Sequence, residues 1–451
     1  MPAFNVDGDG LRFMQEPGID GDAIPVEALF IDTPGANAQR KNSDLLTHRA
    51  RYGALCLPAA AMALYTLQAF APAGGAGIRT SMRGGGPLSA LVVPQGEEDG
   101  PPPLWQTLWA NILPGEHPVP PADTVFAWLR SDLPVGREAG GVEIHQGQPP
   151  FDSRLHPFFG MPRRIWLQVS GNGACDLTGR EGPLVTGFLQ KPHGLNYGGW
   201  IHPLTPYRRQ RQAETPYSVK PKSGRFGYRD WVAVTVGGAG DDETKLSLAA
   251  RSVALARRER ADVLSEKGSR PSARIRLAGW AMSNMEAISY VVAEQPLPLA
   301  DPADVAFMDD LAREMAEAGD TVNRALRFAI QNALDVKDDK GSVGQARNAF
   351  YERTDDAFHE VLAEVVLEIG ADSRGEAARR WLDAMRSAAL NIFDATCPVP
   401  LEDAEAAARV VAARAGLYWT LRGWGKRGKA LFEILHLPVP QKRETREEEP
   451  A

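Results

Sequence analysis

The chain has 451 residues, of which 43% are hydrophobic and 24% are charged, and its formal net charge is −7. Its length predicts two or three domains, and its composition is that of an ordinary globular protein. The sequence has no run of eighteen apolar residues and no basic N-terminal segment followed by an apolar one, which argues against a membrane span and against secretion. We therefore expect a cytoplasmic protein.

The cysteines and histidines form no recognisable site. Cys56, Cys175 and Cys397 lie far apart and no C-x-x-C pair occurs, which argues against a disulfide framework and against zinc. The eight histidines form no H-x-H or H-x-x-x-H pair, and there is no G-x-S-x-G motif. The sequence predicts no catalytic residue, no metal and no cofactor. A metal-dependent hydrolase is an alternative without a supporting motif.

Charged residues are segregated along the chain. Basic residues gather at 208–211, 220–222 and 257–260, and acidic residues gather at 97–99, 241–243 and 447–449. Nucleic-acid binding depends on local basic patches rather than on net charge. The segregation therefore leaves room for a DNA-binding face on an acidic protein.

The first part of the chain, up to about residue 302, is rich in Gly and Pro and contains short apolar runs. Ile165–Val169 and Trp231–Val236 have the length and composition of strands. Pro58–Phe70 and Leu104–Ile112 have helical character. We predict an irregular α+β domain with long loops over residues 1–302.

After Pro302, apolar residues recur at intervals of three, four or seven, which predicts amphipathic helices. Breaks at 338–344, 370–375 and 398–400 divide this part into four helices with short connections. Their stripes include Leu311 and Leu326, Phe358 and Leu362, Trp381 and Met385, and Val410 and Leu417. The pattern predicts a C-terminal four-helix bundle over 303–437 and a disordered charged tail over 438–451.

The segment 73–86 carries six glycines and two arginines. Glycine lets a backbone approach another molecule closely, and N–H groups in such loops bind phosphates or enter a DNA groove. The pattern fits neither a P-loop nor a dinucleotide-binding fingerprint. A mobile surface loop is the alternative, and composition by itself favours it.

Two further turns are unusual. At 190–194 a strand-like run ends in Lys-Pro-His-Gly, which predicts a turn that presents Lys191 to solvent. At 278–287 a glycine-bounded turn carries amide and thioether side chains at its tip. A solvated lysine in the first segment, and core packing of Trp280 in the second, are the ordinary explanations.

Four segments resemble motifs of the large subunit (the CasA family) of type I-E CRISPR surveillance complexes, known as Cascade. Leu11–Gln15 is similar to the family's HPF(M/L)Q segment, and Gly74–Gly85 is similar to its glycine loop and following (L/M)RGG motif. Thr186–Leu189 resembles its TGF strand, and Gly279–Met285 resembles its GYDMDNM turn. The motifs occur in the family's order ahead of a helical region, and the resemblance covers nearly the whole chain.

The resemblance implies recognition of the PAM, a short motif beside the target, on double-stranded DNA, followed by strand separation for guide RNA pairing. In the family, a glycine loop, a lysine finger and a wedge enter the PAM from the minor groove, whose degenerate code suits tolerance of several PAM sequences. A gapless match to some members would place Pro192 at the finger. The DNA-binding residues carried over to this chain are the glycine loop Gly74, Gly75, Ala76 and Gly77, the finger Lys191, and the wedge Asn284, Met285 and Glu286.

The resemblance also implies partners, namely the double-stranded DNA target, the guide RNA 5′ handle, other Cascade subunits and a helicase-nuclease. The segment 37–44, with Arg40 and Lys41, would help to seat the subunit near the 5′ handle. Only ten residues precede Leu11, where family members carry a long segment, so we expect a shortened N-terminal lobe and leave recruitment of the helicase-nuclease open. The alternative function is a shortened interaction scaffold of the same complex without DNA-reading activity.

Overall fold

The structure is a computed structural model of the chain. It describes residues 2–42, 44, 47–96, 100–115, 118–138, 142–209, 215–222, 226–236, 238–239, 246–260, 272–283 and 285–441. The predicted wedge residue Asn284 lies outside the described residues, and so does most of the predicted tail, residues 442–451.

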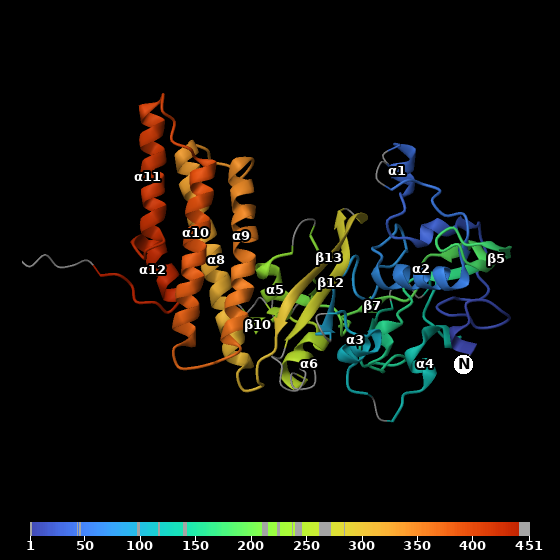
Figure 1. Ribbon diagram of the computed structural model, residues 1–451. Coiled ribbons are helices and arrows are strands. Elements are labelled where there is room, and N and C mark those ends of the chain that lie inside the picture. Colours follow the sequence, from blue (N-terminus) through green and yellow to red (C-terminus); the bar gives the residue numbers. More distant parts are fainter. Residues whose placement is uncertain are drawn as a thin grey trace, which may run out of the picture.

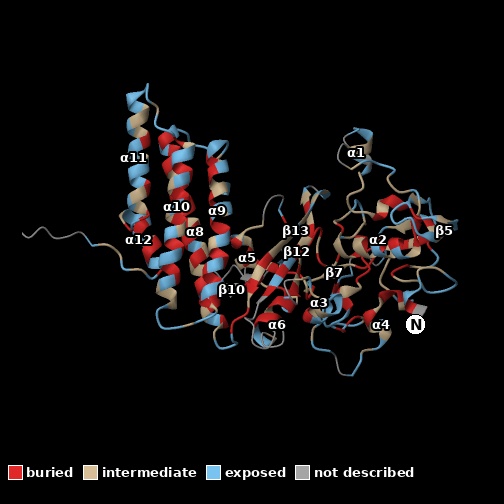
Figure 2. Cartoon of the chain, in the orientation of Figure 1, coloured by how far each residue is buried: buried red, intermediate tan, exposed pale blue. Residues whose placement is uncertain are grey.

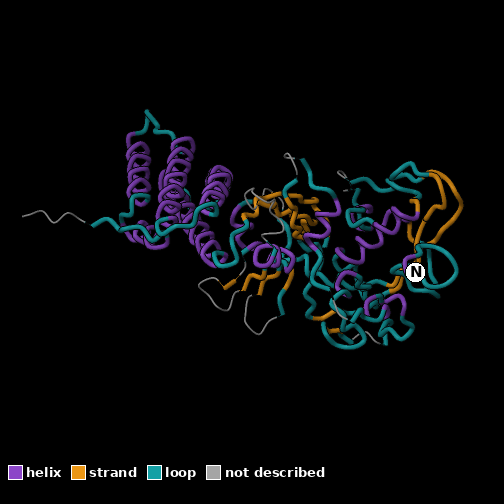
Figure 3. Tube along the Cα trace, turned by 60° about the horizontal axis from the view of Figure 1, so that its bottom comes forward, coloured by secondary structure: helices purple, strands orange, loops and turns teal. Residues whose placement is uncertain are grey.

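The molecule is elongated, with long helices at one end and an irregular mixed region at the other (Figures 1 and 3). A long antiparallel hairpin crosses the middle of the molecule between these two ends (Figure 1). The predicted α+β class with helices in the C-terminal part is confirmed.

The N-terminal region is built on the antiparallel hairpin of β5 (Arg164–Ala174) and β6 (Glu181–Lys191), so the predicted strand at 165–169 is confirmed. The short strands β1 (Ile24–Pro25) and β2 (Leu55–Cys56) pair with β6. The other elements here are η1 (Pro2–Phe4), η2 (Val26–Leu29), α1 (Ala36–Arg40), α4 (Ala122–Val125), η4 (Ala127–Leu129), β4 (Ile144–His145), η5 (His156–Phe158) and β7 (Tyr197–Gly198).

Helix α2 (Leu57–Phe70) packs on β6 and confirms the helix predicted at 58–70. It ends because Pro72 disfavours a helical backbone at Ala71, whose ψ is 144°. Its buried side chains join those of the hairpin in one cluster, which we call the N-terminal core. The largest fully buried members are Trp128, Phe151, Phe188, Met14, Leu29 and Leu55.

A second antiparallel sheet has the strand order β13–β12–β3, with β3 at Ser89–Pro94, β12 at Ser272–Ser283 and β13 at Glu286–Pro298. Helices α5 (Tyr228–Thr235) and α6 (Arg251–Glu259) share a buried cluster with its inner face. Helix α3 (Leu104–Asn111) lies at the edge of β3. There the Asn111 side chain donates to the Val92 carbonyl over 2.7 Å and accepts from the Val92 N–H over 2.8 Å. A smaller sheet has the order β10 (Gly238–Ala239), β11 (Leu246–Leu248), β8 (Tyr207–Arg209) and β9 (Tyr217–Ser218).

The run Trp231–Val236, predicted to be a strand, instead forms most of helix α5 and its C-cap, so this prediction is wrong. Tyr228, Trp231 and Val234 recur every three residues and are buried on one face. The Tyr228 ring stacks on Phe358 with centroids 4.7 Å apart, and Trp231 Nε1 donates to the Pro296 carbonyl over 2.8 Å. Packing between the sheet and the helices therefore outweighs the strand preference of the valines.

Within the described residues, the C-terminal part consists of α8 (Val305–Leu334), α9 (Ser342–Val365), α10 (Ser373–Thr396), α11 (Ala404–Thr420) and a shorter α12 (Gly425–Ile434). Helices α8, α9 and α10 pack on one another, and α11 packs mainly on α8. Figure 2 shows buried residues along α8 and α10 and a largely exposed α11, which buries only Val410 and Leu417. The separate helix α12 was not predicted.

The second buried cluster, which we call the C-terminal core, includes residues on both sides of position 302. It joins Ile275 and Leu277 of β12 to Leu326 of α8 and Trp381 of α10. The buried side chains do not separate at residue 302. The predicted division into residues 1–302 and 303–437 stays a prediction. The central sheet shares its core with the helices rather than with the N-terminal region.

A buried ion pair joins the sheet layer to the helices. Arg257 Nη2 of α6 lies 2.5 Å from Asp309 Oδ1 of α8, and both side chains are 7% exposed. Arg260 donates to the Trp109 carbonyl over 3.2 Å and lies above the Trp109 ring at 5.0 Å. Arg257 and Arg260 of the basic run at 257–260 are therefore structural.

None of the described helices is long and apolar enough to cross a membrane. The described residues also contain no group of three or more His, Cys, Asp or Glu side chains placed to hold a metal ion.

Candidate nucleic-acid interface

The predicted glycine loop leaves the C-terminus of α2 and runs over the surface before β3. Gly74, Gly75 and Ala76 are exposed, and Gly77 is partly buried. The Ile78 N–H donates to the Gly75 carbonyl over 3.1 Å and closes a turn. Gly75 (φ +114°) and Gly77 (φ +77°) have backbone angles that favour glycine.

These two glycines differ in their surroundings. No atom of a described residue lies within 4 Å of the position that a Cβ would take at Gly75. At Gly77 a Cβ would lie 2.8 Å from Pro192 Cβ and 2.9 Å from the His193 ring. The His193 N–H also donates to the Gly77 carbonyl over 2.7 Å. The loop is therefore anchored at Gly77 and open to solvent at Gly75.

This anchor places Lys191 near the glycine loop, because Lys191 ends β6 just before the turn that holds Gly77. Lys191 Nζ lies 2.8 Å from Asp20 Oδ1, and the two side chains are 37% and 91% exposed. The hydrogen bond from Lys191 lowers the pKa of the Asp20 carboxyl. Such an exposed ion pair is weak, so an anionic ligand would compete with Asp20 for the lysine.

The motif that follows the loop is buried. Arg83 is 4% exposed and donates to Thr205 Oγ1 over 2.7 and 2.9 Å and to Ser89 Oγ over 2.7 Å. Its guanidinium lies over the Phe70 ring at 4.6 Å. Burial lowers the pKa of Arg83 to about 10. This arginine fixes the exit of the loop.

The adjacent glycines are required by close packing. A Cβ at Gly85 would lie 2.7 Å from Pro72 Cβ. At Gly86 a Cβ would lie 2.6 Å from Met282 Cγ and 2.7 Å from the Trp280 carbonyl oxygen. Gly86 is therefore the point at which the loop region touches the β12–β13 hairpin.

A second buried arginine braces the start of the loop. Arg163 Nη1 donates to the Leu67 carbonyl over 2.9 Å, and its Nη2 donates to the Pro72 carbonyl. The Gln68 side chain exchanges two hydrogen bonds with the Arg163 backbone, at 2.9 and 3.0 Å. Burial lowers the pKa of Arg163 to about 10, which still leaves it charged at neutral pH. Among the described residues neither Arg83 nor Arg163 pairs with a carboxylate, so both add positive potential beneath the loop.

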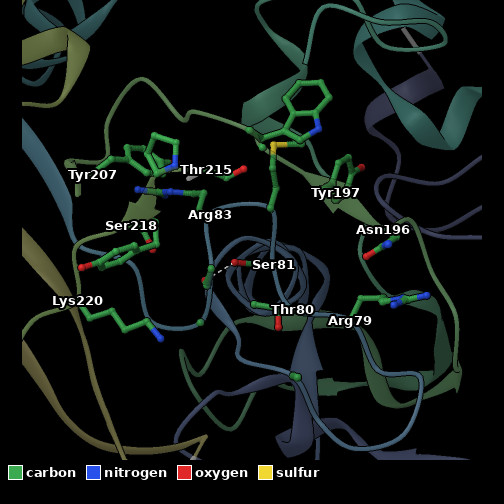
Figure 4. A pocket seen from close by; sticks show the side chains of 18 of the residues that line it. Arg79, Thr80, Ser81, Arg83, Asn196, Tyr197, Tyr207, Thr215, Ser218 and Lys220 are labelled. Atoms are coloured by element: carbon green, nitrogen blue, oxygen red, sulfur yellow. Dashed lines mark hydrogen bonds between the residues drawn. The ribbon is translucent and has the colours of Figure 1, made fainter. Parts of the chain in front are cut away.

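A hollow of about 630 Å³ lies beside the glycine loop (Figure 4). Lys220 extends toward it from one side, and Arg79 lies on the other side (Figure 4). Lys220 is exposed and forms no ion pair with another described residue. The lining includes Gly75, Gly77, Arg79, Thr80, Ser81, Arg83, Asn196, Tyr197, Ser218 and Lys220. Its size and its cations would admit a phosphate and part of a sugar.

The described residues of the predicted wedge lie at the tip of the β12–β13 hairpin. Met285 is 63% exposed and has φ +69°, and Glu286, the first residue of β13, is also exposed. The segment that carries Lys220 contacts the same hairpin, because a Cβ at Gly279 would lie 3.2 Å from Pro221 Cγ. The glycine loop, the finger and the hairpin are thus connected by direct packing.

The structure brings together residues that the sequence did not combine. Lys220 belonged to a basic run, but only the fold places it beside the glycine loop. Asp20 and Arg163 had no sequence signal. Helix α1 (Ala36–Arg40), which contains the first part of the segment 37–44, lies apart from this cluster (Figure 1), and Arg40 donates to Asn37 Oδ1 over 2.7 Å. Ser43 lies outside the described residues.

The fold is that of the CRISPR proteins called CasA or Cse1. The chain is similar to CasA of Thermus thermophilus, with a TM-score of 0.64 and 17% identity over 93% of this chain and 80% of that chain. It is similar to Cse1 of Thermobifida fusca, with a TM-score of 0.60 and 13% identity over 94% of this chain and 79% of that chain. It is also similar to a chain of a CRISPR RNA-guided surveillance complex, with a TM-score of 0.58 and 17% identity over 90% of this chain and 78% of that chain.

At the level of sequence, the family model described as CRISPR-associated protein Cse1 matches residues 1–392. The chain belongs to this family, which confirms the resemblance found in its motifs. Helices α11 and α12 lie beyond the matched residues. No curated protein sequence matches the chain.

Proposed function

We propose that this chain is the large subunit of a type I-E CRISPR surveillance complex. It recognises the PAM on double-stranded DNA, promotes strand separation for guide RNA pairing and helps to recruit the helicase-nuclease. Its partners are the DNA target, the guide RNA 5′ handle and the other Cascade subunits. It carries no catalytic site of its own.

One arrangement carries this proposal. The exposed turn at Gly75 is anchored through Gly77 to the residues directly after Lys191, and Lys220 flanks the same hollow. A bare backbone beside two cations suits a DNA groove, where the backbone approaches base edges and the ammonium groups contact phosphates or bases.

The wedge has a separate role. Its described residues, Met285 and Glu286, lie at the end of a hairpin that packs on the loop region through Gly86. An apolar side chain inserted at a base step costs on the order of a few kcal/mol of unstacking, and guide RNA pairing offsets that cost.

Gly75 is the cleanest test of groove recognition. We expect the reconstituted complex with Gly75→Leu to lose PAM-duplex binding by steric exclusion, while Gly75→Ala retains most of it. Both variants carry the same backbone strain at φ +114° and neither side chain meets a protein atom at Cβ, so the difference reports the space available to DNA. Gly77→Leu is unsuitable, because its Cβ would strike Pro192 and His193.

The two lysines are distinguished by salt and by sequence. Lys220→Ala should weaken binding to all duplexes and reduce the slope of log affinity against log salt by about 0.9, as expected for one lost phosphate contact. Lys222→Ala is its control, since Lys222 has the same charge and does not line the hollow.

Lys191→Ala should weaken binding to PAM-bearing duplex by about 1–3 kcal/mol and reduce discrimination between PAM sequences.

Met285→Ala should leave PAM-duplex binding intact and slow R-loop formation, because a wedge acts after docking. The shortened-scaffold alternative predicts instead that Gly75→Leu and Lys191→Ala complexes assemble and bind PAM duplex like the unmodified complex, and that Met285→Ala complexes form R-loops at the unmodified rate. That outcome would refute DNA recognition by these residues.

A further inference from the structure

The outer face of the β12–β13 hairpin carries a row of exposed apolar and aromatic side chains. On β13, Ile288, Tyr290 and Val292 are 55%, 55% and 58% exposed. Trp280 of β12 is the register partner of Tyr290, and their ring centroids lie 5.0 Å apart with the planes tilted by 57°. The water-facing side of an antiparallel sheet is normally polar, so this row indicates a binding surface.

Cations lie on the same face. Arg274 and Arg276 alternate with inward residues of β12 in step with Trp280, and their side chains are 55% and 47% exposed. Glu294 accepts from Arg276 Nε over 2.6 Å and from Arg274 Nε over 3.2 Å. Two guanidinium groups share this one carboxylate, which leaves an excess positive charge around Arg274 and Arg276, whereas the exposed Glu286 lies at the tip end of the hairpin.

Exposed aromatic rings beside arginines are the combination that binds single-stranded nucleic acid. Bases stack on the rings, which tolerate any base, and the cations contact the phosphates. A partner protein would bury an apolar row of this kind equally well, but only an anionic partner would also pair with the uncompensated guanidinium charge. The positive charge around Arg274 and Arg276 therefore favours a polyanion.

The row starts next to the candidate wedge. The Trp280–Tyr290 pair lies three residues along β12 from Ser283, the last residue before the tip. At about 3.3 Å per residue this places the ring pair roughly 10 Å from the tip. A base released at the tip lies within reach of the rings.

We infer that this face, formed by Trp280, Ile288, Tyr290 and Val292 with the adjacent arginines, binds the first unpaired bases of the displaced DNA strand. The inference rests on the proposed function, because it requires the duplex to open at the hairpin tip. The displaced strand is the occupant, because the guide RNA pairs with the other one. Stacking would hold the opened strand and slow its re-annealing.

The test uses the complete complex with guide RNA. Tyr290→Ala should leave binding to a short PAM duplex unchanged and reduce the rate of R-loop formation on a fully paired target roughly tenfold, the effect expected from losing one stacked base. Tyr290→Phe keeps the ring and should restore the rate. A second target has mismatches between its two DNA strands at the first positions, so this part of the duplex is already open. On this target the Tyr290→Ala complex should still release the displaced strand faster than the unmodified complex does.

The occupant is identified by photo-crosslinking with 5-iododeoxyuridine at the first two positions of the displaced strand. We expect crosslinks to Trp280 or Tyr290, and none when the label lies in the strand paired to the guide. R-loop formation by Tyr290→Ala at the unmodified rate, or crosslinks only from the paired strand, would overturn the inference.

Two other failures give different results. If the face docks a protein, Tyr290→Ala complexes will lack a subunit before any DNA is added, which refutes this inference and leaves PAM recognition intact. If the proposed function fails, Gly75→Leu and Lys191→Ala complexes will bind PAM duplex normally, irrespective of the behaviour of Tyr290 variants.

Discussion

The two buried cores of this molecule are stabilised in different ways. The C-terminal core is built on long helices with continuous apolar faces, and its buried arginine, Arg257, is neutralised by Asp309. The N-terminal core is built on short elements and long loops, and the arginines that brace its boundary, Arg83 and Arg163, bond to hydroxyls and backbone carbonyls. The irregular region thus keeps uncompensated positive charge, and the candidate DNA-binding loops are found there.

This difference has a physical basis. A loop buries backbone carbonyls that no helix or strand satisfies, and a guanidinium supplies several donors in a fixed plane. Pairing that guanidinium with a carboxylate would remove the positive potential that attracts phosphate. Arg257 also donates to a backbone carbonyl, that of Thr235 at the end of α5, over 3.2 Å, so the difference lies in the counter-charge that Asp309 supplies.

The largest expected effect tests the extent of the C-terminal core. Leu326→Asp places an unpaired carboxylate at a position that is 0% exposed and should destabilise this core by about 4–5 kcal/mol or more. Hydrogen exchange should show lost protection in β12 and β13 together with α8–α10, while β5 and β6 stay protected. Retained protection of β12 and β13 would support instead the predicted boundary at residue 302.

The buried arginines should respond unequally to removal. Arg257→Met leaves Asp309 charged and buried and should cost about 3–5 kcal/mol of unfolding free energy, and the double variant with Asp309→Leu should regain most of it. Arg83→Met leaves only hydroxyls without a donor and should cost about 1–3 kcal/mol. Chemical denaturation measures both. Equal costs would mean that the two arginines are held in the same way.

Each core also contains a buried histidine, and replacing the two histidines should change the free energy of unfolding in opposite directions. His156 Nδ1 lies 2.8 Å from the Val125 carbonyl and its ring stacks on Phe151, whereas neither ring nitrogen of His359 has a hydrogen-bond partner among the described residues. His156→Leu should therefore destabilise the protein by about 1–3 kcal/mol. His359→Leu should stabilise it by about 1 kcal/mol. A destabilised His359→Leu protein would contradict this account.

The same histidines predict acid sensitivity. Burial lowers the pKa of both His156 and His359 to about 4, below the value of about 6.5 in the unfolded chain. Between these values the unfolded state binds more protons, so their contribution to stability is complete above pH 6.5 and is lost as the pH falls toward 4. From pH 7 to pH 5 each should cost roughly 2 kcal/mol. Burial likewise lowers the pKa of His202, so unfolding curves of His359→Leu should lose only the share of this pH dependence that His359 contributes, roughly 2 kcal/mol.

The smallest effect concerns the exposed pair between Lys191 and Asp20. Asp20→Asn removes the competing carboxylate without changing the size of the side chain, so the complex should bind PAM duplex about twofold more tightly at low salt. The gain should disappear at high salt, where such a pair is screened. Weaker binding by Asp20→Asn would show that Asp20 positions the lysine rather than competing for it.

Some features were predicted from the sequence because local periodicity specifies them. The stripes through Leu326, Phe358 and Trp381 predicted the C-terminal helices, since an amphipathic pattern over many turns has one stable solution. The strand at 165–169 and the helix at 58–70 were predicted in the same way. The order of the four motifs along the chain also pointed to the Cse1 family, because motif order can be read from the sequence without knowledge of the fold.

Other features depended on contacts between distant segments. The run 231–236 has strand composition but is helical, because it packs between β13 and α9. Only tertiary structure distinguishes Gly75, which is open to solvent, from Gly77, which packs on His193. Only tertiary structure places Lys220 beside the loop and ties Lys191 to Asp20, because these pairs lie far apart in the chain and no local periodicity encodes their meeting.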